Sequence, residues 1–174
     1  YYIEHSLVIG YNKDVCVQSQ NREHILITLQ FTEDHSPEEN KKLLKDLQLF
    51  IKQNSEHEII LKHHPRFNNE INNEELLKSS NVSITNKSLE DCLKSCKIHA
   101  TAYSTTVFEA AALKIPSVFY SDWKLEIYKN QFTYPINSLN DTLRMYSDLQ
   151  KKIEDWHKYY YEPLNETAWL KIVQ

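Results

Sequence analysis

One stretch, residues 98–120, constrains the fold of this chain more than any other. It begins with an apolar run of small residues, Ile98–Tyr103, which has the composition of a buried strand. A short Ala-rich helix is expected over Val107–Leu113, and a second apolar run, Ser117–Tyr120, follows Pro116. This order of strand, helix and strand is the building block of a parallel sheet.

Three hydroxyl residues in a row, Ser104, Thr105 and Thr106, connect the first strand to the helix. The carboxyl end of a strand and the N-terminus of a helix meet here, and unpaired N–H groups and the helix dipole favour anions at such a place. We therefore predict a phosphate site. Thr106 and Glu109 also have the spacing of a capping box, so a purely structural role for Thr106 stays open. One helix start does not need three hydroxyls, which favours Ser104 or Thr105 as the ligand-facing residue.

The rest of the chain alternates strands and helices without repeats or a low-complexity linker. Strands are expected at His24–Phe31, Glu58–His64, Val82–Thr85 and Phe132–Ile136. Helices are expected from Ser36 to about Asn54, at Asn73–Ser79, Ser88–Cys96 and Asp122–Asn130, and from Ser138 or Asp141 to Tyr160. The predicted fold class is α/β, a doubly wound, mostly parallel, Rossmann-like sheet with helices on both faces. Residues 1–20 are expected to be a linker or edge segment, 21–160 the Rossmann-like domain and 161–174 a C-terminal tail.

Composition excludes several classes of protein. A net charge of −4 with scattered basic residues argues against nucleic acid or an anionic membrane as the main partner. No apolar run is long enough to span a bilayer. The three cysteines, Cys16, Cys92 and Cys96, do not form a disulfide framework, and we interpret them as buried thiols of a reducing compartment. The first residue is not Met, so a piece of a longer protein is expected.

The single glycine, Gly10, excludes a glycine-rich phosphate loop, because no glycine follows any later strand. Side chains and a helix N-terminus must then hold any phosphate. Pro65 restricts His64 to an extended conformation at the end of its strand, where the imidazole N–H can donate to a phosphate oxygen. In a parallel sheet His64 and Ser104 lie at the same edge, on strand ends that we expect to be neighbours. A charge-assisted hydrogen bond is worth roughly 1.5–3 kcal/mol, so a few could position a diphosphate.

These motifs resemble the carboxyl-terminal half of GT-B glycosyltransferases. The resemblance rests on KHHPR at residues 62–66 and on CLKSCKIHATAYSTTVFEAAALKIPSVFYSDWKLEIY at residues 92–128. It is strongest to the group with His-Pro and Ser-Ser or Ser-Thr motifs: bacterial sialyltransferases and polysialyltransferases, capsule polysaccharide transferases, and CDP-glycerol glycerophosphotransferases of teichoic acid synthesis. Two positions depart from the pattern: Ala102 replaces the aspartate of the glycerophosphotransferases, and Lys114 replaces a glycine before Pro116.

The resemblance implies that this domain binds the nucleotide of a donor sugar, with CMP or CDP as the expected nucleotide. It makes His64, within the His64-Pro65 motif, a phosphate ligand and the catalytic residue that stabilises the leaving phosphate. Ser104, Thr105 and Thr106 would also bind phosphate, Glu109 the ribose, and the loop from Gln30 to Thr32 would lie near the donor. Catalysis is expected to need no metal, since there is no Asp-x-Asp motif, and no cofactor besides the nucleotide-sugar substrate.

The resemblance also implies partners and a location. An amino-terminal acceptor domain outside this chain would supply the catalytic base and bind a carbohydrate acceptor, so the fragment alone is expected to be inactive. A bacterial surface polysaccharide is the expected product, with inversion at the transferred sugar. The expected location is the cytoplasm, and peripheral association of the longer protein with the inner face of the membrane is compatible with it.

Two alternatives remain open. A UDP-sugar 2-epimerase-like domain shares the architecture but normally has a glycine-rich turn in place of the hydroxyls. A non-catalytic, flavodoxin-like binding module such as a receiver domain needs an acidic cluster after its first strand, which Glu33 and Asp34 could imitate. It would leave His64 and the hydroxyl turn unexplained.

Overall fold

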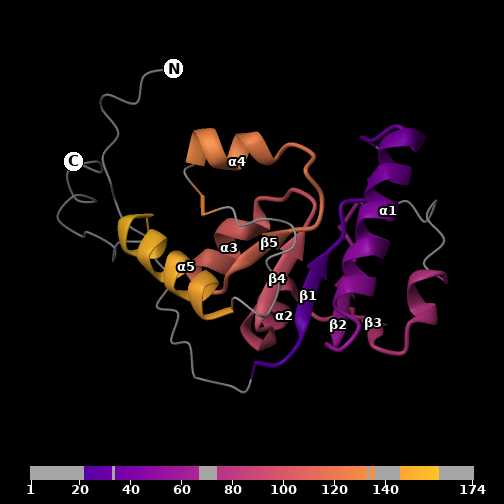
Figure 1. Ribbon diagram of the computed structural model, residues 1–174, viewed down its shortest axis with the longest axis horizontal. Coiled ribbons are helices and arrows are strands. Elements are labelled where there is room, and N and C mark those ends of the chain that lie inside the picture. Colours follow the sequence, from indigo (N-terminus) through magenta and orange to yellow (C-terminus); the bar gives the residue numbers. More distant parts are fainter. Residues whose placement is uncertain (1–21, 33, 67–73, 133, 136–145, 161–174) are drawn as a thin grey trace, which may run out of the picture.

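A five-stranded, fully parallel sheet forms the centre of the computed structural model, which describes residues 22–32, 34–66, 74–132, 134–135 and 146–160 (Figure 1). The strand order is β3-β2-β1-β4-β5, and the chain is an α/β, Rossmann-like fold as predicted. The strands are β1 (Ile25–Thr28), β2 (Ile59–Lys62), β3 (Val82–Ile84), β4 (Ile98–Thr101) and β5 (Ser117–Phe119). The helices are α1 (Pro37–Gln53), the 3-10 helix η1 (Leu76–Lys78), α2 (Leu89–Ser95), α3 (Thr106–Ala112), α4 (Leu125–Phe132) and α5 (Tyr146–Tyr160).

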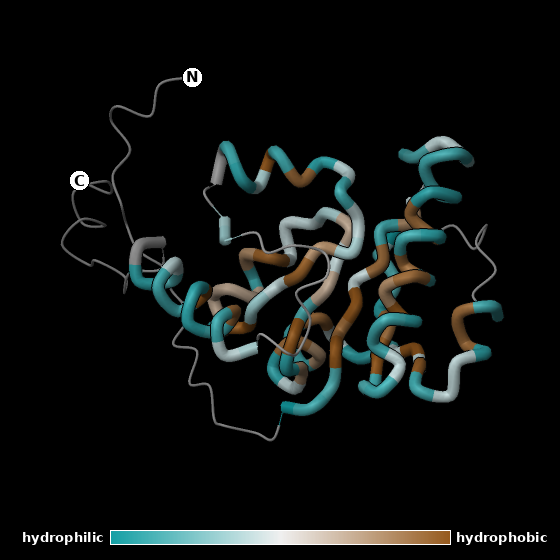
Figure 2. The backbone as a smooth tube through the Cα atoms, viewed as in Figure 1, coloured by the Kyte–Doolittle hydropathy of each residue, from teal (hydrophilic) through white to brown (hydrophobic). Residues whose placement is uncertain are grey.

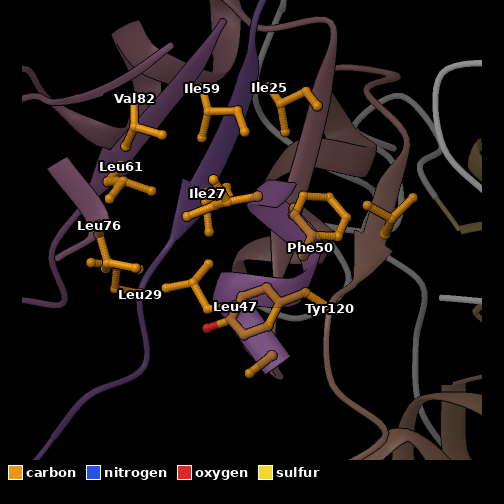
Figure 3. Close-up of a cluster of buried hydrophobic side chains, with 14 of the residues drawn as sticks. Ile25, Ile27, Leu29, Leu47, Phe50, Ile59, Leu61, Leu76, Val82 and Tyr120 are labelled. Atoms are coloured by element: carbon orange, nitrogen blue, oxygen red, sulfur yellow. The ribbon is translucent and has the colours of Figure 1, made fainter. Parts of the chain in front are cut away.

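The central strand β1 is buried on both faces, as its nearly continuous apolar sequence predicts. Ile25 and Ile27 pack against α1, in the cluster that Figure 3 shows. Leu26 packs on the opposite face against α2 and α3. Each fully buried aliphatic side chain of this kind contributes about 1.5–3 kcal/mol to folding. The hydropathy colouring of Figure 2 agrees, because the strands are mainly hydrophobic and the outer side of α1 is hydrophilic.

Helix α1 begins as its sequence predicts. Ser36 is the N-cap, and its hydroxyl accepts a hydrogen bond from the Glu39 N–H at 3.2 Å. The Glu39 carboxylate accepts from the Ser36 N–H at 2.8 Å, which completes a capping box around Pro37 in the first turn. Ser88 likewise caps α2 by accepting from the Asp91 N–H at 3.1 Å.

A third cluster joins α3 to α4 and α5 on the side of the sheet away from α1. Its buried members include Val107 of α3, Phe119 of β5, Tyr128 of α4 and Trp156 of α5. Phe119 and Tyr128 have ring centroids 5.0 Å apart, and Phe108 stacks on Trp156 at 6.0 Å. Aromatic packing therefore holds α5 against α3.

Three predicted elements differ from the structure. The segment Asn73–Ser79 contributes only the single turn of η1 to the described residues. The predicted strand Phe132–Ile136 is wrong at its start, because Phe132 ends α4, and Pro135 belongs to no strand. Helix α5 is described only from Tyr146, so the predicted start at Ser138 or Asp141 lies outside the described residues, as do the segments predicted at 1–20 and 161–174. None of the described helices is long and apolar enough to cross a membrane.

The end of α3 explains the unusual Lys114. The Lys114 N–H donates to the Ala111 carbonyl and the Ile115 N–H donates to the Ala110 carbonyl, both at 2.9 Å, which is the Schellman pattern. Lys114 has φ of 55°, in the left-handed region that favours glycine. The backbone at residue 114, where the resembling families have glycine, must therefore adopt a left-handed conformation. This conformation costs lysine more free energy than it costs glycine.

We predict that Lys114→Gly raises the free energy of unfolding by about 0.5–1 kcal/mol, because glycine has no Cβ to clash in the left-handed region. Urea denaturation of both proteins measures the change. The matched control is Lys114→Ala, which removes the lysine side chain but keeps Cβ and should give no gain. Equal stabilisation by both substitutions would contradict the assignment to backbone strain.

Candidate functional site

The carboxyl ends of the five described strands lie at one edge of the sheet, because all described strand pairs are parallel. Helix α1 connects β1 to β2, whereas β4 lies on the other side of β1, so the strand order reverses between β1 and β4. Open α/β sheets bind ligands outside the carboxyl ends of strands at such a switch point. His64 follows β2 and Ser104 follows β4 at this edge, as predicted from the sequence.

The hydroxyl turn differs in detail from the capping-box prediction. Thr105 is the residue before α3 and makes no side-chain cap, and Thr106 is already the first helical residue. Ser104 supports the turn, because its Oγ accepts from the Thr106 N–H at 3.2 Å. The predicted box between Thr106 and Glu109 is therefore wrong. Ser104 keeps its own O–H as a donor, while Thr105 and Glu109 are exposed.

Thr106 points into the protein. Its Oγ1 lies 3.4 Å from Thr28 Oγ1 and 3.4 Å from His99 Nε2. His99 is fully buried, with Nε2 2.9 Å from Thr28 Oγ1 and Nδ1 2.9 Å from Ser117 Oγ. Burial lowers the pKa of His99 to about 3, so the ring is neutral and uses one nitrogen as donor and the other as acceptor. His99 is therefore a buried, hydrogen-bonded residue of β4 whose ring contacts side chains of β1, β5 and α3.

His64 presents a hydrogen-bond donor at the edge. Its Nδ1 accepts from the Arg66 N–H at 3.1 Å. In the neutral imidazole the proton is then on Nε2, which is a donor. Partial burial and, second, the Arg66 charge lower the pKa of His64 below its ordinary 6.5. Pro65 itself is exposed.

The two predicted motifs share an edge, but their strands are not neighbours. β1 lies between β2 and β4 and pairs with both. At a spacing of about 4.8 Å per strand, the two strand ends are roughly 10 Å apart, which suits a diphosphate better than a single phosphate. The loop after β1 fills the interval: Asp34 pairs with Arg66 at 2.8 Å, and His35 Nε2 accepts from the Tyr103 hydroxyl.

An aromatic and cationic group beside the hydroxyl turn was missed by sequence reasoning. His35 has its ring centroid 5.7 Å from that of Tyr103 and 4.8 Å from that of Trp123. Lys124 Nζ lies 4.5 Å from the centroids of both Tyr103 and Trp123. His35 Nδ1 donates to Asn40 Oδ1 at 3.2 Å, which leaves Nε2 as the acceptor. The sequence indicated this group in part, because the loops that carry His35, Tyr103 and Trp123 each follow a strand of the same sheet.

The remaining predicted residues lie in supporting positions. Gln30 and Thr32 follow β1 at the same edge, and both are buried, with 6% and 3% of their surface exposed. Thr32 Oγ1 donates to Asp34 Oδ2 at 3.4 Å. Ala102, at the aspartate position of the resembling pattern, is fully buried in the cluster on the α1 face.

The described residues also show where two of the cysteines lie and whether any side chains could bind a metal ion. Cys92 and Cys96 are buried thiols, as expected, and burial raises the pKa of Cys96 to about 12. Among these residues no group of three His, Cys, Asp or Glu side chains could hold a metal ion. A pocket of about 260 Å³ lies beside α1, between Phe50 and Tyr120, and its lining does not include His64 or the hydroxyl turn.

Comparison with known proteins gives one family and a set of similar structures. The family described as CDP-Glycerol:Poly(glycerophosphate) glycerophosphotransferase matches residues 19–168. No curated protein sequence matches the chain. The H444N variant of the wall teichoic acid polymerase TagF is 17% identical with a TM-score of 0.58, over 87% of this chain and 42% of that one. The chain thus spans about two fifths of the length of that polymerase.

Two other solved structures share the fold. The glycosyltransferase SnogD from Streptomyces nogalater is 14% identical with a TM-score of 0.57, over 95% of this chain and 48% of that one. The UDP-GlcNAc 2-epimerase of Methanocaldococcus jannaschii is 19% identical with a TM-score of 0.51, over 87% of this chain and 44% of that one. At these identities the likeness establishes the fold.

The buried His99 predicts an acid-sensitive stability. The unfolded chain binds a proton at His99 near pH 6.5, whereas the folded chain does so only near pH 3, so the stability from this residue is complete above pH 6.5 and falls as the pH falls below it. We expect the free energy of unfolding in urea to decline between about pH 7.5 and about pH 5 more steeply in the natural protein than in His99→Gln. His57→Gln, at a loop histidine, is the control and should keep the steep decline. Equal slopes for all three proteins would contradict the prediction.

Proposed function

The chain belongs to the CDP-glycerol:poly(glycerophosphate) glycerophosphotransferase family, and from this premise we propose that residues 21–160 bind the cytidine nucleotide of a transferase donor. The donor is a CDP- or CMP-linked sugar or polyol. The transferase builds a bacterial surface polysaccharide. The sialyltransferase-like and capsule-type groups, which use CMP-linked donors, are the finer alternatives within this proposal.

The observation that carries the proposal is the placement of His64 and of Ser104-Thr105 on the two sides of β1, at the switch point of the sheet. The interval of two strand spacings, roughly 10 Å, suits two linked phosphates. His64 Nε2–H would donate to one phosphate. The hydroxyls of Ser104 and Thr105 would donate to the other phosphate. Thr106 would support the turn from the interior of the protein.

These donors would act as electrostatic catalysts. When the bond between the transferred group and the nucleotide breaks, negative charge grows on the leaving phosphate, and fixed donors that face this charge lower the barrier. His64 suits the role in its neutral form, because Nε2 is already the protonated nitrogen. In this mechanism the chain uses no metal and no cofactor, and the attack inverts the transferred centre.

Arg66 would add a positive charge at the same place. Its guanidinium pairs with Asp34 at 2.8 Å, and both side chains are largely exposed. An exposed ion pair of this kind is worth little, so a diphosphate could replace Asp34 as the partner of Arg66. Glu109, exposed on the first turn of α3, would accept hydrogen bonds from the ribose hydroxyls.

The acceptor side of the reaction is proposed to lie outside this chain. The chain spans 42% of the TagF structure, so a second domain would bind the carbohydrate acceptor and supply the general base. The 174 residues alone would then bind the donor without transferring it. We place the whole protein in the cytoplasm, with peripheral association with the inner face of the membrane as its route to the acceptor.

Titration calorimetry of this chain with CMP, CDP, UDP and ADP tests the proposal. We expect a cytidine nucleotide to bind, and CDP to bind more tightly than CMP if the donor is a CDP-linked polyol. Tighter binding of CMP would favour the sialyltransferase-like and capsule-type groups. Preference for UDP would support the epimerase-like alternative, and absence of binding to all four nucleotides would leave a non-catalytic module.

His64→Ala should weaken CDP binding by roughly ten- to a hundredfold, the equivalent of a charge-assisted hydrogen bond of about 1.5–3 kcal/mol. The matched control is His63→Ala, one residue earlier, which should stay within about twofold. If the losses were reversed, the ligand would be His63. If neither substitution weakened binding, the phosphate role of this loop would be refuted.

A bound diphosphate should raise the pKa of His64, because the negative charge favours the imidazolium over the neutral ring. NMR titration of the His64 ring should give a pKa below 6.5 in the free chain. The pKa should be higher with bound CDP-glycerol. This ligand is chosen because its diphosphate diester does not itself titrate in this pH range. The affinity should accordingly rise as the pH falls through the interval between the two midpoints. An unchanged midpoint at saturating ligand would contradict direct contact.

A further inference from the structure

A buried polar network lies directly beneath the hydroxyl turn. It contains His99, Thr28, Thr106 and Ser117, and it lies on the face of the sheet that α3 covers. Three of these side chains, those of His99, Thr28 and Ser117, are at most 6% exposed. Buried polar groups cost free energy unless they are hydrogen-bonded, so this network restricts the geometry of the elements that it joins.

The network connects the turn to three strands. His99 lies on β4, Thr28 ends β1, Ser117 begins β5, and Thr106 is the first residue of α3. His99 is the centre, with 2.9 Å contacts to Thr28 and Ser117 from its two ring nitrogens. Thr106 closes a triangle with Thr28 Oγ1 and His99 Nε2, at 3.4 Å from each.

Thr106 is thereby held from two sides. Its N–H donates to Ser104 Oγ at 3.2 Å, and its hydroxyl belongs to the buried network. Rotation of the turn would break one of these contacts or leave the partly buried Thr106 hydroxyl unpaired. The position of the Ser104 and Thr105 hydroxyls at the edge therefore depends on a side chain that is itself fully buried.

We propose that His99 is a positioning residue, which fixes the hydroxyl turn for phosphate binding through Thr106 without touching the ligand. That the ligand is a nucleotide phosphate rests on the proposed function. That His99 fixes the turn through Thr106 rests on the contacts in the structure. His99 would align Ser104 and Thr105 with the anion before binding, so that little ordering is needed when the nucleotide arrives.

The first test uses the chain without nucleotide. Amide hydrogen exchange of residues 105–107 should accelerate in His99→Gln and in Thr106→Val, because both remove the link between the network and the turn. Thr101→Val is the matched control. Its hydroxyl is buried on β4 and donates to the Thr28 carbonyl at 3.3 Å, not to the hydroxyl turn. Exchange at 105–107 that changes equally in all three variants, or in none, would overturn the proposal.

The second test measures CDP affinity in the same variants at a temperature where all are folded. We expect about fivefold weaker binding for His99→Gln and for Thr106→Val, and a value within about twofold of the natural protein for Thr101→Val. Thr106→Ser, which keeps the hydroxyl, should restore binding relative to Thr106→Val. The double variant His99→Gln/Thr106→Val should lose no more than either single change, because both act through one link.

The outcomes separate the two proposals. Failure of the natural protein to bind any nucleotide would refute the proposed function, while the exchange result would still decide whether His99 orders the turn. Should His99→Gln fail to fold, Thr106→Val and Thr106→Ser carry both measurements. Additive losses in the double variant would indicate that Thr106 contacts the nucleotide directly, which would overturn the indirect role of His99.

Discussion

The parallel pairing of β1 with β2 on one side and with β4 on the other is the constraint on which the rest depends. Because all three strands run in the same direction, the segments that follow them leave the sheet at one edge. His64, the loop containing Asp34 and His35, and the turn at Ser104 thus become neighbours although they are far apart in sequence. A ligand at this edge would contact side chains from three separate loops, each anchored by a buried strand.

The described side chains at this edge include neutral hydrogen-bond donors and an ion pair. His64 offers Nε2–H, the turn offers hydroxyls, and Arg66 is held by Asp34 at 2.8 Å. Beneath this layer the sheet is not purely apolar, since His99 stays neutral in full burial and hydrogen-bonds to side chains from β1, β5 and α3. Polar side chains therefore contact the hydroxyl turn in the interior of the protein, and other polar side chains lie at the exposed edge of the sheet.

The sequence predicted what depends on local patterns. The apolar runs gave the strands, and Ser36, Pro37 and Glu39 predicted the start of α1 because all the capping partners lie within four residues. Local patterns could not decide which of three consecutive hydroxyls points into the protein, because the Thr106 hydroxyl contacts Thr28, 78 residues away, as well as His99. The contact of His35 with Tyr103 spans 68 residues and was hidden for the same reason. Phe132 was predicted to start a strand, whereas it is the last residue of α4.

The two faces of the sheet differ in chemistry, and this difference has a consequence for how the chain tolerates change. Toward α1 the strands present aliphatic side chains, whose contacts have no directional requirement, so exchanges among Ile, Leu and Val of similar volume should accumulate there during evolution or library selection. Toward α3 the side chains of His99, Thr28 and Ser117 need partners at fixed angles. Homologues and engineered libraries should therefore diverge freely on the α1 side of the sheet, whereas the polar positions of β1, β4 and β5 on the α3 side should remain nearly fixed.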